Sequence, residues 1–131
     1  MDHERMLTTA SLLSIGLFIS HLAHDIVIGI EAGDLNDLIG GTLISLVWLC
    51  GTLLFSGRLL GLIVTLLGGI VSIAIAGLHM SGGVGTRYAS EPGHYFFVWT
   101  LLVMGLAGSF SLVLSAIGMR KLIKGSTAKE Q

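Results

Sequence analysis

Residues 6–30 read MLTTASLLSIGLFISHLAHDIVIGI, an almost wholly apolar run. The run is long enough to cross a lipid bilayer as a helix, which takes about 20 residues. Three ionisable side chains interrupt it, namely His21, His24 and Asp25. Such groups are rare inside membranes because each costs at least about 2–3 kcal/mol there, and those that occur generally mark a site. The stretch therefore predicts a membrane helix that carries a functional site.

The composition predicts one membrane domain over residues 1–131. The chain is 53% hydrophobic and 11% charged, and that charged fraction is about half the usual one for a soluble domain. We expect the lipid bilayer to surround it. The net charge of −1 indicates no nucleic-acid partner. Cys50 is the single cysteine, which excludes an intrachain disulfide bond.

Polar breaks divide the chain into four apolar segments, and we expect a transmembrane helix in each. The expected spans are about 6–30, 38–56, 59–80 and 95–119, with a polar, frayed tail at 120–131. The start, Met-Asp-His-Glu-Arg, is not a basic signal-peptide region, so we interpret the first span as a retained helix. The predicted fold class is an all-α integral membrane protein with a four-transmembrane-helix bundle.

The cations predict the orientation of the bundle. The side that would hold both termini carries six of them, and the other side carries only Arg87. The six are Arg5, Arg58, Arg120, Lys121, Lys124 and Lys129. Because cytoplasmic loops are enriched in Lys and Arg, we expect both termini in the cytoplasm, with loops 31–37 and 81–94 outside. The expected location is a prokaryotic plasma (inner) membrane.

Small and aromatic residues predict how the last two segments lie. Glycine and serine recur at spacings of three and four in 59–80 and 95–119, which favours close packing of these two helices. The same pattern leaves open a dimer between copies of the chain. We interpret the aromatic residues near the outer boundary as an interfacial belt; they are Tyr88, Tyr95, Phe96, Phe97 and Trp99.

The histidines gather in the outer half of the predicted bundle. His21 lies three residues before His24 and four before Asp25, so these side chains neighbour one another on the helix. His79 ends the third segment and His94 begins the fourth, both toward the outer face. For straight helices of similar tilt we expect His79 to lie about 10 Å shallower than His21.

Imidazole and carboxylate groups at this spacing predict a cofactor site. One form is a zinc-like transition-metal site, and its candidate ligands are His21, His24, Asp25, His79, His94 and Glu91. The other form is haem b held by His21 or His24 together with His79. The leading hypothesis is thus a small polytopic membrane protein that binds a metal ion or haem in its outward-facing half. It would act alone or as a subunit of a redox or transport complex.

Two alternatives stay open from the sequence. An oligomeric small transporter or proton-coupled carrier would use His21, His24 and Asp25 to bind solute or protons. A structural or assembly subunit without cofactor would use the same groups to hydrogen-bond neighbouring helices. Neither a Gly-x-Ser-x-Gly nor a His-Glu-x-x-His motif occurs. The sequence therefore does not indicate whether the protein is an enzyme.

Two resemblances accompany these motifs. His21-x-x-x-Asp25 resembles one half of the intramembrane site of cation-diffusion zinc transporters, but over five residues only, so it implies no shared function. The segments His21-Leu-Ala-His24-Asp25, Phe97-Val-Trp99-Thr-Leu-Leu and Phe110-Ser-Leu-Val-Leu-Ser resemble small four-helix membrane proteins of prokaryotes. That resemblance covers about residues 6–120. It implies the four-span fold and brings no activity, cofactor or site.

Overall fold

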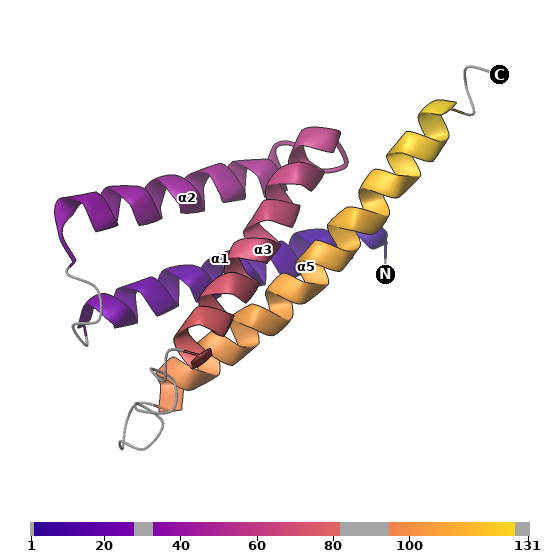
Figure 1. Ribbon diagram of the computed structural model, residues 1–131. Helices are drawn as coiled ribbons and strands as arrows, with labels where there is room; N and C mark the ends of the chain where they lie inside the picture. Colours follow the sequence, from indigo (N-terminus) through magenta and orange to yellow (C-terminus); the bar gives the residue numbers. More distant parts are fainter. Residues whose placement is uncertain (1, 28–32, 82–94, 128–131) are drawn as a thin grey trace.

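The regular elements in the described part of the chain are α-helices. The computed structural model describes residues 2–27, 33–81 and 95–127, and Figure 1 traces the helices through them. They are α1 (His3–Val27), α2 (Leu35–Leu53), α3 (Leu59–Ser81) and α5 (Tyr95–Thr127). All 4 are long and apolar enough to cross a membrane. The all-helical class is confirmed, and the four apolar helices indicate an integral membrane protein.

Local signals set the helix ends. The Asp34 carboxylate accepts a hydrogen bond of 2.9 Å from the backbone N–H of Asp37 and so caps α2. This cap starts α2 at Leu35, ahead of the predicted position 38. Gly57, with a φ of 70°, allows the tight turn between α2 and α3. Helix α5 continues to Thr127, so the polar tail expected at 120 begins as helix.

The tightest helix pair is α3 with α5, as the small residues predict. A Cβ atom added at Gly69 would lie 2.7 Å from the carbonyl oxygen of Gly108, so only glycine permits this approach. The hydroxyl groups of Thr65 and Ser115 are 2.8 Å apart across the same interface. The small residues therefore serve packing within one chain.

Helix α2 packs on α1 and α3, and it makes no contact with α5 in the described ranges. Trp48 is buried, and its indole N–H donates a 2.9 Å hydrogen bond to Ser11 on α1. The Ser11 hydroxyl also lies 2.7 Å from that of Thr52. Polar bonds of this kind hold membrane helices together where lipid provides no hydrophobic driving force.

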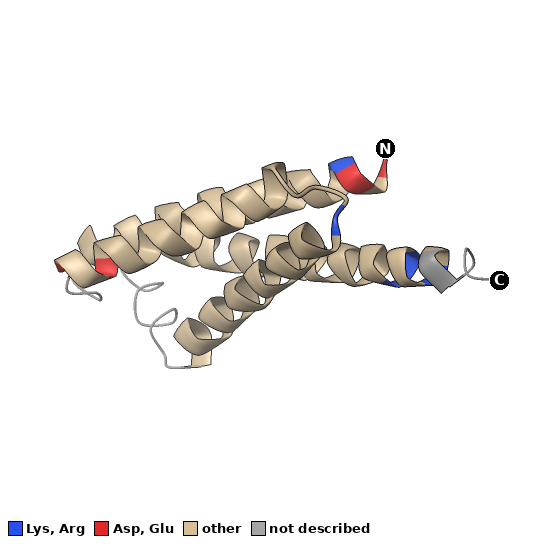
Figure 2. Ribbon diagram, turned by 90° about the horizontal axis from the view of Figure 1, so that it is seen from above, with Lys and Arg blue, Asp and Glu red and all other residues tan. Residues whose placement is uncertain are grey.

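The two helical hairpins cross each other. Figure 1 shows α1 and α2 running at an angle to α3 and α5 instead of parallel to them. Figure 2 shows that Lys and Arg gather at the end of the molecule that holds both termini. The other ends of α1 and α3, where His21, Asp25 and His79 lie, come together through this crossing.

Candidate metal centre

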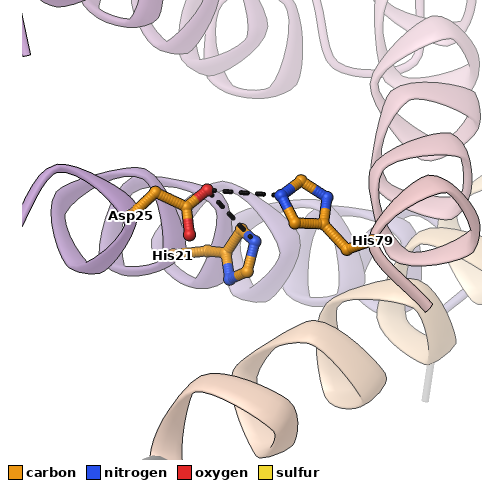
Figure 3. A group of neighbouring side chains, drawn as sticks. All are labelled: His21, Asp25 and His79. Carbon is orange, nitrogen blue, oxygen red and sulfur yellow. Dashed lines mark ion pairs between the residues drawn. The ribbon is translucent and has the colours of Figure 1, made fainter. Parts of the chain in front are cut away.

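Three side chains from two helices meet in the bundle. His21 and Asp25 come from α1, and His79 comes from α3 (Figure 3). The Oδ2 atom of Asp25 lies 3.5 Å from Nε2 of His21 and 3.5 Å from Nε2 of His79. One potential ligand atom from each residue lies within 4.8 Å of the other two. The arrangement is a compact group of two imidazoles and one carboxylate, which we call the His–Asp cluster.

The inward face of α1 positions two members of the cluster. Buried residues recur along this helix at spacings of three and four, which keeps them on one face. They are Leu7, Ser11, Ser14, Ile15, Phe18, His21 and Asp25. His24 falls outside this stripe and is only half-buried. Position on the stripe thus separates His21 and Asp25 from His24.

A backbone hydrogen bond orients the third member, His79. Its Nδ1 atom lies 2.9 Å from the carbonyl oxygen of Ile75, one turn earlier in α3. A carbonyl oxygen can only accept, so Nδ1 carries the proton and donates. Nε2 is then the atom that faces Asp25. Metal-binding histidines are commonly oriented by just such a bond through the other ring nitrogen.

The depth predicted for His79 is wrong. The ring centres of His21 and His79 are 5.1 Å apart, in an edge-to-face arrangement. The predicted offset of about 10 Å assumed straight helices of similar tilt. Because α3 crosses α1 at an angle, the end of α3 that carries His79 lies beside His21.

Phe97 covers the cluster from α5, a role that the sequence interpretation missed. We predicted an interfacial belt residue, but Phe97 is fully buried. Its ring centre lies 4.8 Å from that of His21 and 6.1 Å from that of His79. Phe97 begins the buried stripe that continues through Leu101 and Met104. Phe97, Leu101 and Met104 are spaced by four and three residues, and this helical spacing was the sequence signal that could have identified Phe97 as a buried residue.

The remaining predicted ligands do not join the cluster among the described residues. His24 lies against Phe96 and Phe97, with ring centres 6.0 Å and 5.7 Å away. His94 and Glu91 lie outside the described residues. The cluster thus brings together three of the six predicted metal ligands, namely His21, Asp25 and His79.

The cluster places a buried carboxylate next to two imidazoles. His21 is 2% exposed and Asp25 is 3% exposed. Neither ring nitrogen of His21 makes a hydrogen bond to a described residue. A carboxylate withdrawn from water needs a positive partner nearby. A proton or a transition-metal ion is the kind of cation that two imidazoles and a carboxylate can share.

The described residues define a small helical protein of the membrane class, with a His–Asp–His group of which His21 and Asp25 are buried. Comparisons with protein-family models, with curated proteins and with solved structures found no match to this chain.

Proposed function

We propose that this protein binds a divalent transition-metal ion of the zinc type at His21, Asp25 and His79. The observation that carries the proposal is the convergence of three ligand atoms from two crossing helices within 4.8 Å. Nitrogen and carboxylate ligands in this combination suit zinc and its neighbours, whereas magnesium and calcium prefer oxygen alone.

The distances support an ion of this size. Ligand atoms that lie about 2.0–2.1 Å from Zn²⁺ are about 3.3–3.4 Å apart in a tetrahedron. The two distances from the Asp25 oxygen to the imidazole nitrogens are each 3.5 Å. The third pair of ligand atoms, on His21 and His79, lies within 4.8 Å and would have to move closer when an ion binds. Three protein ligands leave one position for water, solute or another group, as in zinc sites that are not purely structural.

The same geometry favours an ion over haem. In a haem site with two axial histidines, the flat macrocycle lies between the imidazoles. The Oδ2 atom of Asp25 lies 3.5 Å from the Nε2 atoms of both His21 and His79. It would therefore occupy space that the macrocycle needs. We therefore retain the metal ion and not the haem as the proposed ligand of His21 and His79.

The distribution of charges supports an outward-facing position for the site. Lys and Arg gather at the end that holds the termini (Figure 2), and the positive-inside pattern assigns that end to the cytoplasm. The cluster then lies in the outward-facing half of the bundle. A metal ion held there fits a protein that receives ions from outside, alone or as a subunit of a transport complex.

Metal content of the purified protein tests the proposal. The protein in mild detergent is equilibrated with Zn²⁺, freed of excess metal, and analysed for elements and for its visible spectrum. We expect one Zn²⁺ per chain and no Soret band. His21→Ala and His79→Ala should each lose the ion while circular dichroism still reports a helical protein.

His24→Ala is the matched control, because it removes an imidazole from the same helix but outside the cluster. It should keep the ion. A wild-type protein that stays free of metal would contradict the proposal and leave two functions to test. They are the proton-coupled carrier, assayed in liposomes, and the structural subunit, assayed by copurification.

A further inference from the structure

His24 stands at the boundary between the surface and the His–Asp cluster. Its ring centre lies 6.0 Å from that of Phe96 and 5.7 Å from that of Phe97, both on α5. Phe96 is 58% exposed and Phe97 is 0% exposed. The imidazole thus neighbours one exposed ring and one buried ring.

The buried ring connects His24 to the cluster. Phe97 lies 4.8 Å from His21 and 5.7 Å from His24, with an interplanar angle of 34° in both pairs. The two histidines are three residues apart on α1, so their side chains are neighbours on the helix surface. His24 is therefore the imidazole next to His21, and Phe97 packs against both.

A ring nitrogen of His24 has no protein partner within the described residues. Its Nδ1 atom is buried and makes no hydrogen bond there. Buried imidazole nitrogens are normally paired with protein or water, because leaving one unpaired costs free energy. A metal ion that reaches this position could be bound by the Nδ1 atom of His24, beside the cluster.

Access to the cluster presents a physical problem for an ion. His21 and Asp25 are 2% and 3% exposed, and the Phe97 ring packs against His21. A hydrated ion must exchange its water for protein ligands before it enters an apolar interior. A nitrogen ligand next to the site can replace one of these water molecules before the ion reaches the buried ligands.

We propose that His24 is the access ligand of the metal centre: a transition-metal ion binds it transiently on the way to His21, Asp25 and His79. The inference rests on the proposed function and adds a route to it. Because an access ligand is absent from the final coordination, its loss slows loading and release by the same factor. The equilibrium affinity and the stoichiometry stay unchanged.

Stopped-flow loading with Co²⁺ tests the role of His24, since bound Co²⁺ is followed by its visible absorption. Two variants separate ligation from packing. His24→Leu keeps an apolar side chain of similar bulk but loses the donor, and His24→Cys restores a metal-binding donor in a smaller side chain. His3→Ala, at the far end of α1, controls for the loss of an imidazole elsewhere.

We expect His24→Leu to slow loading and release about tenfold, the lower end of the effects that groups beside a metal site produce. His24→Cys should recover most of the rate, and His3→Ala should load like the wild type. Wild-type rates in His24→Leu would overturn the inference, and so would equal slowing in both His24 variants. Loss of one bound Co²⁺ in His24→Leu would also overturn it, by making His24 a resident ligand. If the wild type binds no Co²⁺, the proposed function itself fails.

Discussion

The Nε2 atom of His79 lies 3.5 Å from the Oδ2 atom of Asp25, and this contact joins α3 to α1. The contact links the two crossing hairpins at the ends of the helices remote from the termini. A cation bound there would hold both hairpins together. Several consequences of this link can be measured.

Metal should stabilise the wild-type protein through Asp25. An ion that binds only the folded state stabilises it by about 2.7 kcal/mol at a free concentration 100 times Kd. Asp25→Asn removes the charge and keeps the shape, so Zn²⁺ should then give little stabilisation. Unfolding titrations in detergent, with and without Zn²⁺, measure both values. An equal response to Zn²⁺ in both proteins would show that Asp25 is not a ligand.

Phe97 should stabilise both the bundle and the cluster. Truncation of a fully buried phenylalanine costs about 3–5 kcal/mol of unfolding free energy. Phe97→Ala should show a loss of this size, and Phe97→Leu should lose less because it leaves a smaller cavity. Phe96→Ala is the control, since Phe96 is exposed. Equal effects at positions 96 and 97 would contradict the packing described above.

Gly69 should be essential to the contact between α3 and α5. A Cβ atom there would lie 2.7 Å from the carbonyl oxygen of Gly108, whereas one at Gly77 in the same helix would meet nothing within 4 Å. Gly69→Ala should cost about 1–3 kcal/mol because the helices must separate. Gly77→Ala should be tolerated. The two variants are compared by the free energy of unfolding, and a tolerated Gly69→Ala would refute the close approach.

Much of the fold could be predicted from the sequence because its signals are local. The Asp34 cap and the four apolar segments can be read from neighbouring residues, and so can the glycines of α3 and α5. The buried stripe of α1 could also have separated His21 and Asp25 from His24. These features depend on helix periodicity alone.

The partnership of His79 with Asp25 could not be predicted in this way. It depends on the angle at which α3 crosses α1, and that angle follows from packing along the whole length of both helices. The burial of Phe97 depends on the same packing, because an aromatic residue near a helix end suits an interface or a core equally. The His79–Asp25 contact and the burial of Phe97 both depend on how helices distant in the sequence pack together, and local patterns do not show this.

The orientation can be tested by cysteine labelling in intact cells. In a Cys50→Ala background, Asn36→Cys lies at the start of α2 and Lys121→Cys lies near the end of α5, both exposed. An impermeant maleimide should label position 36 from outside, and position 121 only after the membrane is opened. The reverse pattern would place the termini outside and the cluster on the cytoplasmic side.

X-ray absorption of the Zn²⁺-loaded protein tests the central claim most directly, because it counts the ligands of the ion. Two imidazoles and one carboxylate oxygen are expected at about 2.0–2.2 Å. A spectrum without imidazole scattering, or one with a single imidazole, would contradict a metal centre built from His21, Asp25 and His79.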